Sequence, residues 1–278
     1  MLAPQTVNTI SAAVDKIQNA LPGEIVKINC SISDSDYTTI KNAIASRTQP
    51  IGIDLSAVSM TTLSSGLLNQ CSKICYLKLP NTLTTIGSGA LLGCGCGSTF
   101  KLTIPKNVTT IASRGTEASC YAVEVESGNT SFKAVDGVLY SYDGTTLYTY
   151  PKYKTDVIEY TVPNGVTTIK ESSLYSTQLQ GIVFPASLTL IERAAMNNQS
   201  HLIVVYFMGV NSTLTIKDSV FQNDSKLESI IFVGSKSDWE TKVTCTTISG
   251  NTSWLHGTKV TEIMCNGGGN IDVSSQAE

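Results

Sequence analysis

The chain has 278 residues, of which 41% are hydrophobic and only 15% are charged, and its formal net charge is −3. This length is enough for one large domain or two ordinary ones, each with a sizeable core. The low charge, without a long Lys/Arg run, argues against nucleic acid as a partner, and no apolar run reaches the ~18 residues that a membrane span requires.

The N-terminal residues 1–52 are predicted to form a helix-strand-helix cap. Apolar residues recur at helical spacing over residues 7–21, and Pro22-Gly23 ends that helix. Residues 25–28 alternate like a strand, a second helix begins near Ser33 or Asp34, and another strand follows at residues 51–55. Such a cap would close one end of a repeat array, because an open end exposes core side chains and a strand edge.

A short phrase recurs along residues 53–240. Four copies place an apolar residue three positions and an isoleucine six positions after a proline, within residues 77–86, 102–111, 160–169 and 182–191. Weaker copies lie at 53–63 and 205–216, and residues 230–233 resemble a last strand. Except for one long gap, the copies lie roughly 22–25 residues apart, a period typical of leucine-rich repeats. Each copy predicts a short strand that ends at its proline, which cannot donate to a sheet.

These phrases resemble the BspA-like, or treponemal-type, class of bacterial leucine-rich repeats, whose repeat is approximately L-x-x-I-x-I-P-x-x-V-x-x-I-G-x-x-A-F-x-x-C. Residues 77–94 match this pattern well, and residues 179–196 match its first two-thirds. Together with the period, the resemblance implies an α/β repeat fold: a right-handed leucine-rich-repeat solenoid with a curved parallel sheet and turns of helix on its convex side. The copy at 111–120 has Arg114-Gly115-Thr116 in place of Ala-Phe, which predicts an irregular convex side there.

The long gap between copies predicts a β-hairpin insertion at about residues 121–158. Its turn is expected at Asp143-Gly144, because Asp-Gly between alternating apolar residues is a strong hairpin signal. A similar insert recurs in the BspA-like family, which favours one continuous solenoid over a separate domain. Tyrosines concentrate in the insert, and they either pack against the solenoid or form an aromatic platform for a ligand. The candidate platform residues are Tyr140, Tyr142, Tyr148 and Tyr150.

Beyond the last repeat, residues 241–266 are expected to form a C-terminal cap. Trp239 and Trp254 are predicted to cover the edge of the last strand. Residues 267–278 are polar and rich in glycine, which predicts a disordered tail.

The residues that could carry catalysis or bind a metal are sparse. Cys71, Cys75, Cys94 and Cys96 leave three alternatives open: a ladder of buried thiols, disulfides or a zinc site. The ladder is favoured because Cys71 and Cys94 occupy the same repeat position. The only histidines, His201 and His256, belong to no nucleophile signature, and no glycine motif for a nucleotide is present. We therefore expect no catalytic residues, metal or cofactor.

Strand alternation predicts which side chains point outward from the concave sheet. The outward residues Asp54, Lys78, Thr103 and Thr161 are polar, as a solvated sheet face requires. Farther along the chain they become apolar, at Val183, Tyr206 and Ile231, with Val204 beside them. Exposed apolar patches usually mark interaction sites. The alternatives are coverage by the chain's own C-terminal segment or contact with a second copy in a homodimer.

The function predicted from these observations is non-enzymatic binding or adhesion through the concave repeat surface. The family resemblance implies a bacterial protein at the cell surface or in the periplasm, with host extracellular-matrix or cell-surface proteins as partners. A scaffolding module of the cell envelope is the alternative, and an enzyme with a dispersed carboxylate site is the least favoured. No signal segment is visible at the first residues, which leaves a cytoplasmic location open.

Overall fold

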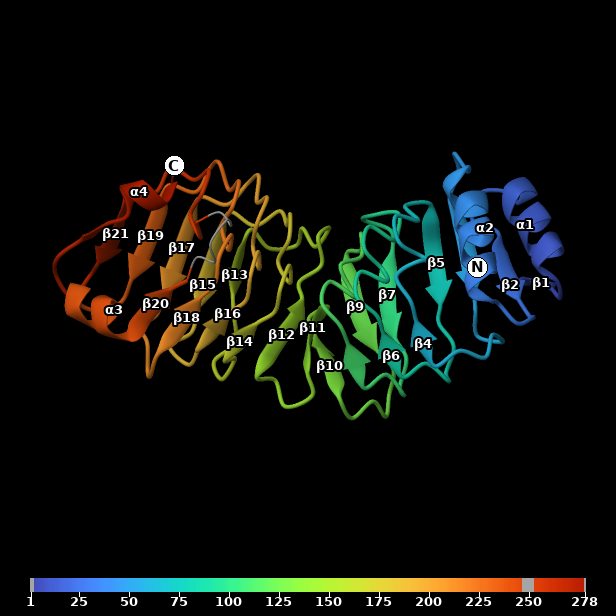
Figure 1. Cartoon of the computed structure of the whole chain (residues 1–278), viewed down its shortest axis with the longest axis horizontal. Helices are drawn as coiled ribbons and strands as arrows, with labels where there is room; N and C mark the ends of the chain where they lie inside the picture. Colours follow the sequence, from blue (N-terminus) through green and yellow to red (C-terminus); the bar gives the residue numbers. More distant parts are fainter. Residues whose placement is uncertain (1–2, 247–252, 278) are drawn as a thin grey trace. The chain divides into compact units, whose positions relative to one another are not determined.

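The computed structural model describes residues 3–246 and 253–277 (Figure 1). The chain divides into two compact units, Met1–Tyr142 and Asp143–Glu278, each of which is described by itself. Within the described ranges, the helices are too short or too polar to cross a bilayer.

The first unit begins with alternating strands and helices. They are β1 (Gln5–Val7), α1 (Ile10–Asn19), β2 (Ile25–Ile28), α2 (Asp34–Ala45) and β3 (Ile51–Asp54). The Thr9 side chain caps α1 by accepting a hydrogen bond from Ala12 N at 3.1 Å. Ile17 on α1 and Ile40 on α2 are fully buried, and β1, β2 and β3 run parallel. The predicted helix-strand-helix order is confirmed, and β1 is an additional strand that the pattern did not indicate.

The strands of the repeats in this unit form two sets. The longer ones are β5 (Ile74–Lys78), β7 (Lys101–Ile104) and β9 (Ala122–Val125). The shorter ones are β4 (Thr62–Leu63), β6 (Thr85–Ile86) and β8 (Thr110–Ile111), which form a parallel sheet of their own. β5 pairs with β3 and β7 pairs with β9, but β5 and β7 belong to different sheets. The longer-strand sheet is therefore interrupted between β5 and β7.

A β-hairpin ends the first unit. Its strands are β10 (Phe132–Val135) and β11 (Val138–Ser141), which pair antiparallel. Its turn is at Asp136-Gly137, where φ is 49° and 79°, and it is additional to the predicted turn at Asp143-Gly144. Two successive residues with positive φ match a tight hairpin turn. Asp143-Gly144 also forms a turn, with Asp143 Oδ1 accepting from Thr145 N at 3.0 Å. Because one unit ends at residue 142 and the other begins at residue 143, a single continuous solenoid stays a prediction.

The second unit adds one strand to each of two parallel sets with each repeat. The longer set is β13 (Glu159–Thr161), β15 (Gly181–Phe184), β17 (Val204–Phe207), β19 (Ser229–Phe232) and β21 (Glu262–Cys265). The shorter set is β12 (Thr146–Thr149), β14 (Thr168–Ile169), β16 (Leu190–Ile191), β18 (Leu214–Ile216) and β20 (Val243–Cys245). Figure 1 shows the longer strands side by side. Inward side chains of both sets are buried, which makes this unit a parallel β-solenoid.

Aromatic side chains fill the core of the second unit. The rings of Phe184 and Phe207 are 5.2 Å apart. Trp239 lies on α3 (Lys236–Lys242). Its ring centroid is 5.5 Å from that of Phe207 and 5.2 Å from that of Phe232, in edge-on contacts. Trp254 stacks on Trp239 at 6.3 Å. The sequence predicts that both tryptophans cover an outer strand edge, but in the structure they are buried and extend the core.

Tight turns occupy the positions where turns of helix were expected. Equivalent residues of successive repeats, such as Gly89, Arg114 and Ala194, have positive φ angles of 61°, 56° and 53°. Several of these turns donate to the next repeat, as in Leu91 N to Gly115 O at 3.1 Å and Met196 N to Val220 O at 3.1 Å. The Arg114 turn keeps the positive φ and accepts a bond from the preceding repeat through Gly115 O, so the expected irregularity is not seen in these two features.

The end of the chain is more ordered than its composition indicates. Residues 271–277 contain β22 (Ile271–Asp272) and α4 (Ser274–Ala277), whereas the sequence predicts a disordered tail. β22 pairs antiparallel with β21, and Val273 is buried, with its N–H donating to Thr261 O at 2.9 Å. The glycines at 267–269 form the loop that returns the chain to β21.

Candidate functional site

The longer-strand sheet of the second unit presents one continuous row of outward side chains, called here the outward row. Register partners join Thr161 to Val183, Val183 to Tyr206, Tyr206 to Ile231 and Ile231 to Met264. In a parallel sheet, register partners lie about 4.8 Å apart and point to the same face. The sheet therefore brings together the three apolar residues that alternation predicted, and it adds Met264.

Burial confirms which face is outward. Ile182, Val205 and Ile230 alternate with the row and are fully buried. Val183, Tyr206, Ile231 and Met264 are each half-buried. Trp239 contacts Phe207 and Phe232, which point inward, so it lies on the opposite side of the sheet from the outward row. Neither tryptophan covers the row, and that form of self-coverage is ruled out.

Neighbouring side chains widen the row into a larger surface. Val204 lies two residues before Tyr206 on β17 and therefore on the same face, as predicted, and Met208 is 48% exposed. Met208 N donates to Phe184 O at 2.9 Å and Val233 N donates to Phe207 O at 2.8 Å, which continues the strand register past the strand ends. We define the apolar patch as Val183, Val204, Tyr206, Met208, Ile231, Val233 and Met264. Extending the alternation beyond each strand would have found Met208 and Val233, but Met264 lies in a strand that was not predicted.

One border of the apolar patch is acidic. Glu159 and Glu262 occupy the next outward row, together with Gly181, Val204 and Ser229. A Cβ on Gly181 would lie 3.1 Å from Glu159 Cγ and 3.5 Å from Val204 Cγ1, so the Glu159 side chain crosses the glycine next to the patch. Glu228 lies at the same border, and its Oε1 forms an ion pair with Lys259 Nζ at 2.8 Å.

The outward residues of the first unit are polar, as predicted, but they are not equally accessible. Lys78 is exposed and Thr103 half-buried. Asp54 is only 5% exposed, because its carboxylate turns back to accept from Ser56 N at 2.8 Å. Asp54 is therefore not part of a solvated face. Thr103 lies opposite Glu124 on β9.

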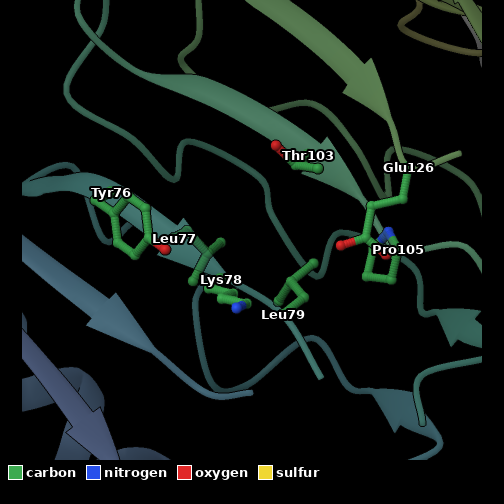
Figure 2. A pocket seen from close by; sticks show the side chains of 7 residues that line it. All are labelled: Tyr76, Leu77, Lys78, Leu79, Thr103, Pro105 and Glu126. Carbon is green, nitrogen blue, oxygen red and sulfur yellow. The ribbon is translucent and has the colours of Figure 1, made fainter. Parts of the chain in front are cut away.

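The interruption between β5 and β7 leaves a pocket of about 180 Å³. Figure 2 shows Lys78 and Leu79 on one wall and Thr103 and Pro105 on the other, with Tyr76 and Glu126 at the ends. Glu126 is held by accepting from Lys106 N at 3.0 Å. The structure thus places two predicted surface residues, Lys78 and Thr103, in one small polar pocket.

The four tyrosines of the insertion do not share an exposed surface. Tyr140 and Tyr150 are each only 2% exposed, Tyr148 is half-buried and Tyr142 is 57% exposed. Tyr150 packs against the Tyr160 ring at 4.7 Å. An aromatic platform made of all four residues is therefore wrong, because two of them serve the core.

Three cysteines of the first unit, Cys71, Cys94 and Cys120, are buried in its core. Cys71 and Cys94 are fully buried free thiols, and burial raises the pKa of Cys71 to about 11. Cys120 is also buried, with its pKa raised by burial to about 12. Among the residues that the structure describes, no group of three or more His, Cys, Asp or Glu side chains has the arrangement of a metal site.

Comparison with known proteins identifies relatives of this fold. A family model described as the BspA type leucine rich repeat region matches residues 6–121 and 146–248 in six copies. No curated protein sequence matches the chain significantly.

Among solved structures, a leucine rich cell surface protein from Faecalibacterium prausnitzii is 16% identical, with 88% of this chain and 87% of that chain aligned and a TM-score of 0.55. A leucine-rich repeat protein from Eubacterium ventriosum is 17% identical over 94% of this chain and 86% of its own, with a TM-score of 0.48. The pneumococcal vaccine antigen PcpA is 15% identical, with 86% of this chain and 78% of that chain aligned and a TM-score of 0.39. At these identities, the first similarity establishes a common fold.

Proposed function

The chain belongs to the BspA-type leucine-rich-repeat family, and from that premise we propose that it is a non-enzymatic binding protein whose apolar patch holds a protein partner. The observation that carries this proposal is the register of β15, β17, β19 and β21, which aligns apolar side chains where a solvated sheet would carry polar ones. Repeat proteins commonly bind partners on such extended surfaces.

The chemistry of the apolar patch suits a protein surface. Tyr206 lies at its centre, between Val183 and Ile231, and tyrosine is among the residues that contribute most to binding at interfaces. Met208 and Met264 flank it, and flexible thioether side chains adapt to different apolar surfaces. A partner that covers the patch removes this apolar area from water, which stabilises the complex by about 25 cal/mol per Å² before the costs of association.

A location at the bacterial cell surface, with adhesion to host proteins, completes the proposal. The Faecalibacterium prausnitzii protein that shares the fold is described as a cell surface protein. The alternative of an envelope scaffold predicts no affinity for host proteins, which separates the two experimentally.

The test compares the wild-type chain with a Val183→Asp, Tyr206→Asp double variant. Both are measured by surface plasmon resonance on immobilised extracellular-matrix proteins: fibronectin, laminin, fibrinogen and collagen. We expect wild-type binding to at least one of them, and a loss of about tenfold or more in the double variant, because two charges would be buried in an apolar contact. A Thr189→Asp variant is the matched control, since Thr189 is exposed on another part of the same unit.

Three results would contradict the proposal. A negative panel would favour the scaffold, and equal binding by both proteins would place the contact elsewhere. A large drop in melting temperature for the double variant would mean that the patch is part of the core. Light scattering on the wild type and the double variant tests whether a second copy of the chain covers the patch. A wild-type dimer that is lost in the double variant would show that the patch is a dimer interface.

A further inference from the structure

Two half-exposed cysteines lie beside the interruption between β5 and β7. Cys75 is on β5, and Cys96 is in the loop that precedes β7. They differ from Cys71, Cys94 and Cys120, which are buried.

The backbone places Cys96 next to Cys75. Cys96 N donates to Ile74 O at 2.9 Å. The second unit shows what this bond implies: Val204 N donates to Gln180 O, and Val204 is the register partner of Gly181, the residue that follows Gln180. In the first unit, the residue that follows the acceptor Ile74 is Cys75. By this geometry Cys96 lies opposite Cys75, at the spacing of neighbouring parallel strands, about 4.8 Å. A disulfide requires a Cα separation of about 4.4–6.8 Å, so the backbone already satisfies this requirement.

Local irregularity leaves the Cys75 side chain available. Ile51 pairs with Ile74, but Gly52 pairs with Tyr76, so Cys75 is an extra residue at a β-bulge. Burial, and after it the neighbouring Cys96 thiol, raise the pKa of Cys75. Cys96 Sγ also lies 3.1 Å from Thr99 Oγ1 on its own loop. The two thiols are thus neighbours that solvent and small reagents reach.

We propose that Cys75 and Cys96 form a dithiol site that a low-molecular-weight disulfide oxidises to an intramolecular disulfide. The proposal is independent of the apolar patch. The bond would join β5 to the loop ahead of β7, where β5 and β7 belong to different sheets. An oxidising extracellular environment favours such a bond.

The chemistry balances as two successive thiol-disulfide exchanges. The thiolate of one cysteine attacks oxidised glutathione, forms a mixed disulfide and releases one glutathione thiolate. The thiolate of the other cysteine then attacks the protein sulfur of that mixed disulfide and releases the second glutathione. The two cysteines lose two protons and two electrons in total, and oxidised glutathione becomes two molecules of glutathione.

The experiment uses the full chain, reduced first and then exposed to oxidised glutathione. Remaining thiols are alkylated, and the protein is digested with trypsin without reduction. Cleavage after Lys73, Lys78 and Lys101 separates Cys75 from Cys96. We expect peptide 74–78 joined to peptide 79–101 that is alkylated at Cys94, at the summed mass of these two peptides less two hydrogens. Fragmentation spectra should assign the bond to Cys96 rather than Cys94.

Matched variants test the pairing. Cys94→Ser should keep the linked peptides, whereas Cys96→Ser should abolish them and leave Cys75 as a mixed disulfide with glutathione. The proposal is overturned if wild-type Cys75 and Cys96 end as separate glutathione or alkyl adducts, or if Cys75 joins Cys94 instead. Because the decisive measurement is made on the wild type, misfolding of a variant does not obscure it.

Discussion

Asp224 should lower the stability of the folded protein as the pH rises from about 5 to about 8. Its side chain is fully buried in the second unit, where Oδ1 accepts from Gln199 N at 2.7 Å. Oδ2 has no hydrogen-bond partner among the described residues. Burial raises the pKa of Asp224 from 3.8 to about 8, against a smaller lowering by the Gln199 N–H. The folded chain therefore holds this carboxyl protonated at neutral pH.

The sign of the effect follows from proton binding. Between about pH 4 and about pH 8, the folded state binds a proton at Asp224 that the unfolded state has released. The contribution of Asp224 is therefore fully present below about pH 4 and is lost as the pH rises toward 8. At roughly 1.4 kcal/mol per pH unit, the difference between about pH 5 and about pH 8 is on the order of 4 kcal/mol as an upper limit.

The assay is urea unfolding of the wild type and an Asp224→Asn variant across this pH range. Asn keeps the oxygen that accepts from Gln199 N and cannot ionise, so the variant should match the wild type near pH 5 and exceed its stability near pH 8. Glu240→Gln is the control, because Glu240 is exposed and forms only a 3.7 Å ion pair with Lys236. Parallel pH profiles for the wild type and the Asn variant would refute the reasoning.

Two further substitutions test the packing of the first unit. Cys94→Ala should lower the free energy of unfolding by roughly 1–2 kcal/mol, because it leaves a small cavity at a fully buried position; urea unfolding measures this, and an unchanged midpoint would show that the site collapses freely. Arg47→Ala should cost about 1–3 kcal/mol, because the Arg47 guanidinium donates to the carbonyls of Ile17 and Ala20 at the end of α1. Hydrogen exchange should then accelerate in α1, and uniform protection in the variant would contradict this role.

Local periodicity determined much of this structure. The spacing of Pro80, Pro105 and Pro185 predicts where each longer strand ends, and alternation around Tyr206 predicts which side chains point outward. Both patterns can be recognised from residues that are close in sequence, because strand direction and side-chain alternation depend on the local backbone. For that reason Val183, Tyr206 and Ile231 could be assigned to one face without coordinates.

Tertiary structure decided what lies beside each residue. Met264 completes the outward row only because a later segment pairs with β19, and Tyr150 is buried only because the packed core receives its ring. The interruption after β5 and the closeness of Cys75 and Cys96 likewise depend on a bulge and on one backbone bond between repeats. These contacts join residues far apart in sequence, so no local pattern encodes them. The repeated phrase therefore determined the strands and their faces, whereas the stacking of one repeat on the next decided the neighbours, because burial and register exist only after the repeats have packed together.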